Sequence, residues 1–504
     1  MHGGRDIMAE EKSFWGEVPN SAEPRVKADS SDKKIDKRWL WAIAAAVALL
    51  IIGVVVNINH GTTGPTTTTS ALDIDNGDLK INWDRYTTTN LELAESITIT
   101  NSGVYRITGS LENGSILVNA GASGEVKLIL DNVSIKNSSG PAIRCIAGDD
   151  LVIELVGDNY LEDGASYSGD LDEDTNGVIY SKADLTFGGE GSLMLTANYQ
   201  DAIVAKDDLK FNDGTYNITA ADDGIRGKDS VYIVNGNFNI VSKGDSIKST
   251  NDTDAGKGFV LIENGNIEIA SGDDGIHAIR TLMMRGGAIN ISKSYEGLEA
   301  QKIIINNGEV SVVASDDGIN AGGSSDNTST NAMAGDANCE LTINGGNVYV
   351  NAAGDGIDSN GYIYFNGGKV IVDGPTNNGN GALDSGLGII MNGGEVIAVG
   401  SSGMASNLGS ASSVNNISVY FTSSQSAGTK IEIKNSNDET ILEHTSAKTF
   451  NHMSAGNAYF KTGETYTIYL NGTKYQDFII ADVVTTVGNS NSNNMMMPPD
   501  GNRR

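Results

Sequence analysis

The sequence has few of the residues on which compact enzymes usually depend. Only 6% of its 504 residues are aromatic, seven are proline and two are cysteine. Cys145 and Cys339 lie far apart in dissimilar surroundings, so we predict neither a disulfide framework nor a cysteine zinc site. The five histidines show no HExxH pattern and no paired spacing, which leaves a catalytic zinc ion without ligands.

Basic residues are also scarce. Lys and Arg number 34 against 64 Asp and Glu, which gives a formal net charge of −30. A protein with this charge repels phosphate backbones, so no nucleic acid is expected as a partner. Glycine, in contrast, is abundant at 62 residues, and this composition favours many short strands joined by tight turns.

One long apolar run stands near the start of the chain. The 18 residues from Trp39 to Val56 carry no charge, enough to cross a hydrocarbon core of about 30 Å. Basic residues precede the run, so the positive-inside rule keeps the start of the chain in the cytoplasm. We predict a single-pass anchor at the cell membrane with the bulk of the chain extracellular. A cleaved signal peptide is the alternative, but no small-x-small cleavage site follows the run.

These features divide the chain into six segments. We predict a cytoplasmic segment (1–38), a transmembrane anchor (39–57), a Thr-rich stalk (58–74), a repeat domain (75–412), a β-rich C-terminal cap (413–483) and a loose tail (484–504). A cap is expected because the end of a stacked repeat exposes unpaired backbone, and residues 71–130 are expected to close the other end.

An internal repeat dominates the largest segment. It is seen in LKFNDGTYNITAADDGI, FVLIENGNIEIASGDDGI, IIINNGEVSVVASDDGI and LTINGGNVYVNAAGDGI. Each unit has a turn glycine, and an acidic residue follows it nine positions later. The glycines are Gly214, Gly236, Gly265, Gly287, Gly308 and Gly346, and the acids are Asp223, Asp245, Asp274, Glu296, Asp317 and Asp355. Intervals of 22, 29, 22, 21 and 38 residues indicate a unit of about 22 residues, lengthened by polar inserts at 250–257 and 322–339.

A unit of this length fits one coil of an all-β parallel β-helix. It is too short for a strand, a helix and their loops, and it contains few helix formers. Stacked coils would place the isoleucines Ile203, Ile225, Ile247, Ile276, Ile319 and Ile357, with Leu298 in sequence, in one inward ladder. A leucine-rich-repeat solenoid is the alternative, but its LxxLxLxxN pattern is missing, and a β-sandwich does not keep a fixed register over so many units.

The acidic residues would then lie about 5 Å apart on one edge. Like charges at that distance are costly unless a cation neutralises them or their pKa values rise, and calcium accepts six to eight oxygen ligands. The predicted calcium ligands are Asp222, Asp223, Asp245, Asp252, Asp254, Asp273, Asp274, Glu296, Asp316, Asp317 and Asp355. Asp252 and Asp254 come from the first insert, expected beside Asp245. The alternative is that each Asp-Gly is an ordinary turn that repeats because the coil repeats.

A second row of polar residues follows each acid after three positions. It contains Arg226, Lys248, His277, Glu299, Asn320 and Asp358. With calcium beside them, Arg226, Lys248, His277, Asn320 and Asp358 are predicted to contact a sugar chain; a plain solvated face is the alternative. Tyr199, Tyr216, Tyr232 and Tyr349 could stack on sugar rings unless strand alternation turns them inward.

The repeats ADDGIRGKDS, KGDSIKSTNDTDAGKG and GDDGIHA, together with GNAYFKTGETYTIYLNG near the end, resemble a known family. It is the family of surface proteins described as carbohydrate-binding domain-containing proteins, similar in fold to polysaccharide lyases, and the resemblance covers about residues 75–483. It implies a right-handed parallel β-helix, calcium in the Asp-rich turns and binding of plant cell-wall polysaccharides such as pectin or cellulose. It assigns no catalytic residue.

We therefore predict calcium-dependent, non-catalytic binding of a polysaccharide at the cell surface. The scarcity of aromatic platforms favours an acidic polysaccharide over crystalline cellulose. A calcium-dependent lyase of the pectate type is the first alternative, with Arg226 or Lys248 as the base. A structural adhesin, in which calcium only stiffens the solenoid, is the second.

Overall fold

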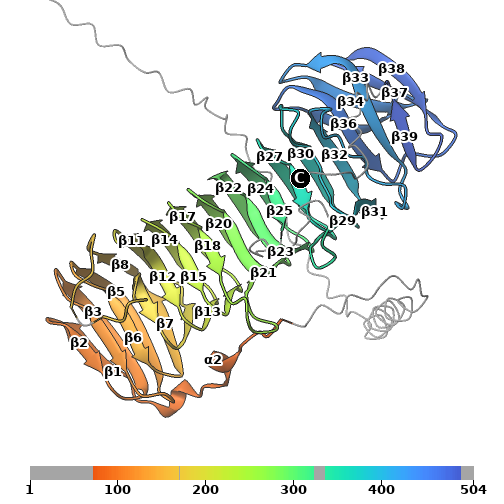
Figure 1. Ribbon diagram of the computed structural model, residues 1–504. Helices are drawn as coiled ribbons and strands as arrows, with labels where there is room; N and C mark the ends of the chain where they lie inside the picture. The colour runs from red at the N-terminus through yellow and green to blue at the C-terminus, as the bar shows by residue number, and fades with distance from the viewer. Residues whose placement is uncertain (1–71, 170, 323–334, 490–504) are drawn as a thin grey trace, which may run out of the picture. The chain divides into compact units, whose positions relative to one another are not determined.

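The computed structural model describes residues 72–169, 171–322 and 335–489. This part of the chain is almost entirely β-structure, and its helices are limited to the four-residue α2 (Gly77–Lys80) and the 3-10 turn η1 (Trp83–Arg85) (Figure 1). The predicted anchor at 39–57 lies outside the described residues. Neither described helix has the length and apolar character needed to span a bilayer.

The chain opens with β1 (Thr89–Leu93), β2 (Ile97–Ile99), β3 (Gly103–Leu111), β4 (Ile116–Asn119) and β5 (Glu125–Asn137). β1 pairs in parallel with β3, β3 with β5, and β2 with β4, so these strands already stack as coils. The expectation that residues 71–130 form a separate cap is therefore wrong. Backbone hydrogen bonding between successive turns of the chain begins at β1.

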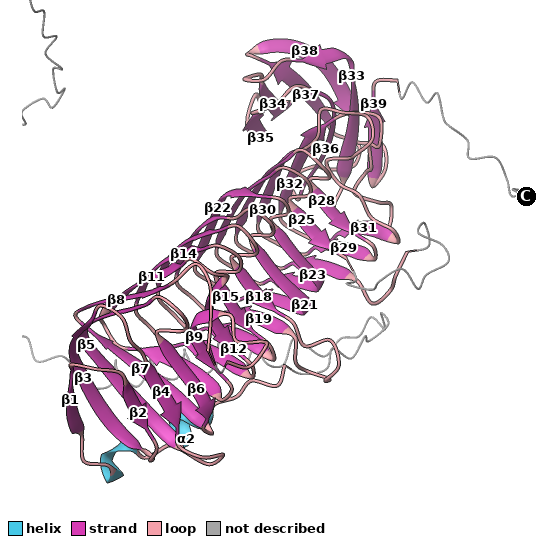
Figure 2. Cartoon of the chain, turned by 60° about the vertical axis from the view of Figure 1, so that its left-hand side comes forward, coloured by secondary structure: helices cyan, strands magenta, loops and turns pink. Residues whose placement is uncertain are grey.

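The following coils form three parallel sheets, visible as stacked strands in Figure 2. The first sheet contains β6 (Ile143–Ala147), β9 (Gly177–Ser181), β12 (Asp201–Ala205), β15 (Ile225–Gly227), β18 (Ile247–Ser249), β25 (Ile319–Ala321) and β28 (Ile357–Ser359). The second contains β7 (Asp150–Val156), β10 (Asp184–Gly188), β13 (Asp208–Phe211), β16 (Ser230–Ile233), β19 (Phe259–Ile262), β26 (Glu340–Ile343), β29 (Tyr362–Phe365) and β31 (Gly388–Met391).

The third sheet contains β8 (Asp158–Asp163), β11 (Ser192–Ala197), β14 (Thr215–Ala220), β17 (Asn237–Ser242), β20 (Asn266–Ala270), β22 (Ala288–Ser294), β24 (Glu309–Ala314), β27 (Asn347–Ala352), β30 (Lys369–Asp373) and β32 (Glu395–Gly400). Two long strands, β21 (Ile276–Met284) and β23 (Leu298–Ile305), run from the first sheet into the second without a break. Each coil thus visits the first, second and third sheet in turn.

The predicted register is confirmed at the turn between the second and third sheets. The strands that follow the turn glycines pair Thr215 with Asn237, Asn237 with Asn266, and Asn266 with Ala288, and the column continues to Asn347. All six predicted glycines have positive φ, and at Gly308, with φ 110°, an added Cβ would lie 2.7 Å from the carbonyl oxygen of Gly287. Glycine is therefore needed for both conformation and stacking.

The core lies between the three sheets. The predicted isoleucine ladder is confirmed: Ile203, Ile225, Ile247, Ile276, Leu298, Ile319 and Ile357 pair in sequence and are each 0% exposed. Side chains alternate along most strands of the third sheet, as in β17, where every second residue is buried. The outer face of such strands therefore remains free to carry functional groups.

The solenoid ends in an antiparallel β region. It is made of β33 (Asn416–Gln425), β34 (Lys430–Asn435), β35 (Thr440–Thr445), β36 (Phe450–Asn457), β37 (Thr465–Leu470), β38 (Thr473–Ile479) and β39 (Val484–Val487). β36 pairs antiparallel with β32, the last strand of the third sheet, and this contact closes the edge of that sheet. Ile397 and Val399 on the outer face of β32 pack into the core of this cap.

Candidate acidic carbohydrate-binding corner

The acidic residues of the repeat lie at the turn between the third and first sheets, which we call the acidic corner. It contains Asp201, Asp223, Asp245, Asp274, Glu296, Asp317 and Asp355. One oxygen of most of these carboxylates accepts a hydrogen bond from the backbone N–H of the next coil: Asp223 N to Asp201 Oδ1 (3.1 Å), Asp245 N to Asp223 (2.9 Å), Asp274 N to Asp245 (2.9 Å), Glu296 N to Asp274 (3.3 Å) and Asp355 N to Asp317 (2.6 Å).

This ladder supports the turn interpretation for one oxygen of each aspartate. The Oδ1 atom joins adjacent coils and stabilises the turn, whichever ion is present. The second oxygen is free to contact other groups, so turn capping and cation binding at the corner do not exclude each other. Whether a carboxylate of the corner can also bind a cation depends on the charged groups that face its second oxygen.

The predicted polar row lies beside the corner and is in register. Arg226 pairs with Lys248, Lys248 with His277, His277 with Glu299, Glu299 with Asn320 and Asn320 with Asp358. These side chains are partly exposed, while their neighbours in the first sheet are buried. Along the row the charge changes from positive to negative, with His277 at the boundary.

In the cationic half of the row, each basic side chain pairs with a corner carboxylate. Arg226 Nη2 lies 2.5 Å from Asp201 Oδ2, and Lys248 Nζ lies 2.6 Å from Asp245 Oδ2. Burial opposes the charge of Lys248, but Asp245 and Asp223 outweigh it and raise the pKa of this lysine. A lyase base needs a lowered pKa, so this geometry does not favour Lys248 in that role.

His277 lies at the boundary between the two halves. Its Nδ1 is 3.6 Å from Asp245 Oδ2, 3.5 Å from Asp274 Oδ2 and 3.3 Å from Glu299 Oε2. Burial opposes protonation of the ring, but the contact with Asp245 and the charge of Glu299 prevail and raise the pKa of His277. These carboxylates therefore favour the protonated form of the imidazole, which stands at the point where the row becomes acidic.

In the acidic half, carboxylates face one another. Asp274, Glu296 and Glu299 offer oxygen atoms within 4.8 Å of one another. Burial, together with the charge of Asp245, raises the pKa of Asp274 to about 9. Burial and the charge of Glu299 raise the pKa of Glu296 to about 7. No lysine or arginine among the described residues forms an ion pair with these three carboxylates.

A second group of the same kind lies further along. Asp355, Asp358 and Asp384 also bring oxygen atoms within 4.8 Å of one another. Burial and the charge of Asp355 raise the pKa of Asp358 to about 8, and burial raises that of Asp355 to about 6. Within the described part of the chain, no basic side chain pairs with this second group. The acidic half thus holds two sets of carboxylates without a lysine or arginine partner in the described structure, and His277 contacts only the first set, at Asp274 and Glu299.

Asn320 stands between the two groups in the polar row. Its Nδ2 donates to Glu296 Oε2 at 3.0 Å, but its Oδ1 is buried and accepts no hydrogen bond from the described residues. A buried acceptor without a donor is costly, and a hard cation would satisfy it. Carboxylates and an amide oxygen are the donor types that calcium prefers, so these residues fit a calcium ion.

Other predicted ligands lie elsewhere. Asp222 and Asp273, the first acids of their DDG turns, are exposed, and Asp316 is half-buried; none belongs to a described set of acidic groups within 4.8 Å. Asp252 and Asp254 follow β18, at the corner between the first and second sheets, where Asn251 donates to both Asp229 (2.7 Å) and Asp254 (2.9 Å). The structure therefore does not bring this insert beside Asp245.

Sequence analysis missed Asp384, because its coil has no Asp-Gly turn. The isoleucine ladder could have revealed it. Leu383 pairs with Ile357 and so continues the ladder, which places the next residue, Asp384, after Asp358 in the polar row. It also missed an acidic group at the corner between the first and second sheets, formed by Asp75, Asp150 and Asp184. Burial and the charge of Asp207 raise the pKa of Asp184 to about 8.

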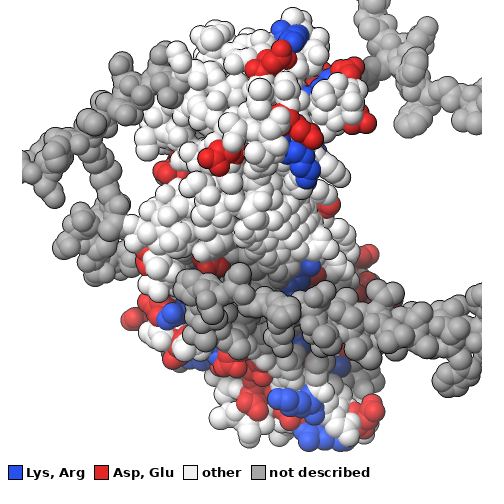
Figure 3. All heavy atoms as spheres, turned by 90° about the vertical axis from the view of Figure 1, so that its right-hand side faces the viewer, with Lys and Arg blue, Asp and Glu red and all other residues white. Residues whose placement is uncertain are grey.

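The surface agrees with the charge balance of the sequence. On the face shown in Figure 3, basic side chains of the described residues lie among acidic ones and do not gather into an extended basic patch. On this face, the described residues offer no continuous basic surface for a phosphate backbone to follow.

Part of this chain is similar to a known protein family. Residues 94–337 match the model of the family described as "Carbohydrate-binding domain-containing protein". A protein of that description from Acetivibrio thermocellus is 34% identical over 128 residues, which are 25% of this chain and 45% of the relative. The match thus spans less than half of the relative's length.

Among solved structures, the polysaccharide lyase-like protein from C. thermocellum, determined as a gadolinium derivative, is 31% identical in sequence. The match covers 41% of this chain and 90% of that protein, with a TM-score of 0.39. The sequence-based resemblance is confirmed: residues 94–337 are similar to the carbohydrate-binding domain-containing proteins.

Proposed function

We propose that the solenoid binds a polysaccharide at the acidic corner, and that calcium held in its acidic half makes this binding possible. The observation that carries the proposal is the change of charge along the polar row. Corner carboxylates are paired with Arg226 and Lys248 in one half, whereas Asp274, Glu296 and Glu299 have no lysine or arginine partner in the described structure.

The raised pKa values support the same reading. Asp274, with a pKa raised to about 9, and Glu296, raised to about 7, hold protons near neutral pH when no cation is present. A divalent cation competes with those protons and removes the repulsion between the carboxylates. The donors we assign to it are Asp274, Glu296, Glu299 and the buried Oδ1 of Asn320, with Asp355, Asp358 and Asp384 as a second set.

The ligand that fits best is a polyuronate such as pectin. A bound calcium ion supplies positive charge and open coordination positions to which a sugar carboxylate can bind. Without it, the acidic half repels an anionic glycan. In the cationic half, Arg226 lies 26% and Lys248 28% exposed at the side chain, so both can still contact a sugar carboxylate or hydroxyl.

The other parts of the sequence-based hypothesis remain proposals. We propose that the coils wind in the right-handed sense and that residues 39–57 tether the solenoid outside the cell. The pairing of Arg226 with Asp201 and the raised pKa of Lys248 give no support to a lyase base, so we do not propose a cleavage reaction.

The proposal is tested with the double variant Asp274→Asn and Glu299→Gln. Both changes remove charge and keep shape, and Asn at 274 can still accept the hydrogen bond from Glu296 N. Titration calorimetry with calcium chloride alone should show loss of at least one site, and binding of polygalacturonate in calcium should fall by roughly tenfold or more, a change of about 1.4 kcal/mol.

The matched control is Glu112→Gln with Glu190→Gln, which removes the same charge from exposed positions outside the corner. It should bind calcium and polygalacturonate like the parent. The proposal is wrong if the parent binds polygalacturonate equally well in a chelator, or if the Asp274 and Glu299 variant keeps both calcium and sugar binding.

A further inference from the structure

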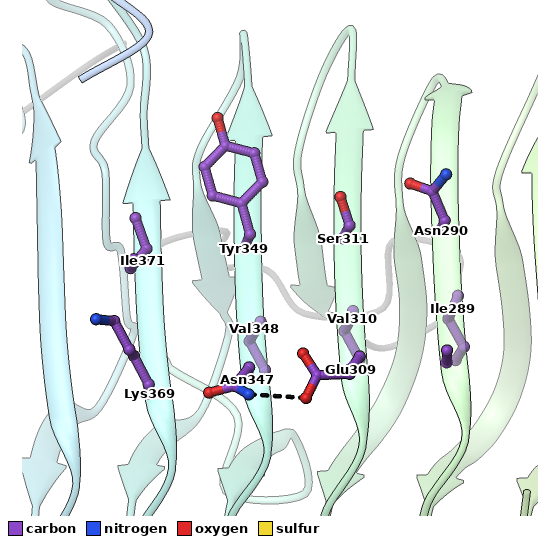
Figure 4. A pocket seen from close by; sticks show the side chains of 11 residues that line it. Ile289, Asn290, Glu309, Val310, Ser311, Asn347, Val348, Tyr349, Lys369 and Ile371 are labelled. Atoms are coloured by element: carbon purple, nitrogen blue, oxygen red, sulfur yellow. Dashed lines mark hydrogen bonds between the residues drawn. The ribbon is translucent and has the colours of Figure 1, made fainter. Parts of the chain in front are cut away.

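A hollow of about 380 Å³ lies on the outer face of the third sheet, away from the acidic corner. It crosses four neighbouring strands, β22, β24, β27 and β30 (Figure 4). Ser311, Tyr349 and Ile371 lie side by side in one row, and Glu309, Asn347 and Lys369 in the row below. None of the residues that line the hollow belongs to the acidic corner or to the polar row, so the two sites share no side chain.

Tyr349 is held rigidly in this hollow. Its hydroxyl donates to Asp373 Oδ2 at 3.0 Å. Asp373 is 0% exposed, and it is fixed by His444 Nε2 at 2.8 Å, the Ser446 hydroxyl at 3.0 Å and the Ala447 N–H at 3.2 Å, all from the cap. Tyr349 is partly exposed, and Figure 4 shows its ring on the strand next to that of the much smaller Ser311.

The polar groups of the hollow balance one another. Asn347 Nδ2 donates to Glu309 Oε1 at 2.7 Å, and Lys369 Nζ lies 3.0 Å from Glu395 Oε1. The lining therefore offers amide, carboxylate and hydroxyl groups, with the single carboxylate of Glu309 in place of the clustered carboxylates of the corner. A fixed aromatic face with hydrogen-bonding groups beside it is suited to an uncharged ring that carries hydroxyls.

We propose that this hollow is a second polysaccharide site, which takes a neutral glycan by stacking one pyranose ring on Tyr349, without calcium. Ile371 extends the apolar platform, and Glu309, Asn347 and Lys369 contact the sugar hydroxyls. Neighbouring strands are about 4.8 Å apart, close to the length of one sugar unit, so a chain crossing the strands meets one strand per unit. The site rests on the proposed polysaccharide binding but not on calcium.

The test is binding of soluble xyloglucan, glucomannan, galactomannan and mixed-linkage glucan in the presence of a chelator, measured by affinity electrophoresis and calorimetry on the full chain. The parent should bind at least one of them. Tyr349→Ala should weaken that binding by about tenfold, whereas Tyr349→Phe, which keeps the ring, should retain most of it. Tyr459→Ala is the control, because Tyr459 is 68% exposed on the cap and away from the hollow.

A second variant, Ser311→Leu, fills the hollow from a partly exposed strand position and should also abolish binding while the melting temperature stays close to that of the parent. The site is refuted if no neutral glycan binds in chelator, or if Tyr349→Ala and Ser311→Leu bind like the parent. The Asp274 and Glu299 variant should keep neutral binding, so loss of polygalacturonate binding and loss of neutral binding report on different sites.

Discussion

At the scale of single residues, the polar-row side chains that face a corner carboxylate, from its own coil or from the next one, decide its charge. Burial opposes the charge of Asp245, but contacts with His277 and Lys248 prevail and lower its pKa. Asp274 occupies the same position in the next coil, faces Glu299, and has its pKa raised to about 9. The sequence was sufficient to predict both rows, but not which carboxylates are neutralised, because that depends on contacts between coils.

These pKa values predict how stability depends on pH. A carboxyl whose pKa is raised in the folded state binds more protons there than in the unfolded chain. For Asp274 the ordinary pKa is 3.8 and the pKa in the folded state is about 9, so stability is lost as the pH rises from the first value towards the second. In chelator, the melting temperature should therefore fall as pH rises through this range. Calcium should reduce the fall, because it replaces the protons at the carboxylates.

Melting curves over this pH range, with chelator and with calcium, provide the measurement. The Asp274→Asn and Glu299→Gln variant is the control, and its melting temperature in chelator should depend less on pH. A parent protein that becomes steadily more stable in chelator up to about pH 9, the value expected for Asp274, would contradict the assignment.

At the scale of elements, turn chemistry made the coil predictable. The glycine column and the isoleucine ladder gave the register of the third and first sheets. The long strands β21 and β23 were not foreseen. After β15 the chain turns at Lys228 and Asp229, whereas IHAIRTLMM continues as one strand without such a corner. The location of the insert at 250–257 was also missed. Asp245 is near it in sequence, but β18 separates the two, so they lie at different corners of the coil.

The glycine column can be tested by substitution. Gly308→Ala places a Cβ 2.5 Å from Met284 Cε and 2.7 Å from Gly287 O at φ 110°, whereas Gly463→Ala has similarly positive φ and no atom within 4 Å. Both changes carry the backbone cost of about 1 kcal/mol. Only Gly308→Ala adds a clash of roughly 1–3 kcal/mol.

Chemical denaturation monitored by circular dichroism should therefore show a larger loss of unfolding free energy for Gly308→Ala. Equal losses for the two variants would mean that the backbone conformation alone, and not stacking between coils, selects glycine at this corner.

At the scale of the whole chain, composition predicted an all-β solenoid, and the repeat predicted its extent. The predicted cap at 413–483 ends just before β39 (Val484–Val487), because β39 pairs in parallel with the distant β33 and leaves no local signal. The hollow at Tyr349 was only partly foreseeable. The sequence offered four tyrosines, and the structure shows that Tyr216 is 0% exposed, whereas Tyr349 is partly exposed and donates its hydroxyl to Asp373.

The orientation of the chain at the membrane remains a prediction from Trp39–Val56 and the basic residues before it. Protease added to intact cells should remove the mass beyond residue 60, and permeabilised cells should show no further loss of the solenoid. Full protection in intact cells would mean that the bulk of the chain lies on the cytoplasmic side.

The pairing of β36 with β32 has a consequence for how the chain folds. Most contacts join residues about one coil apart, so folding can nucleate early and grow by one coil at a time. Until the last segment arrives, however, the growing stack presents an unpaired strand at its C-terminal edge, open to pairing with another chain. The antiparallel cap is synthesised after the coils, and its docking onto β32 is expected to end the period during which the nascent protein is most prone to aggregate.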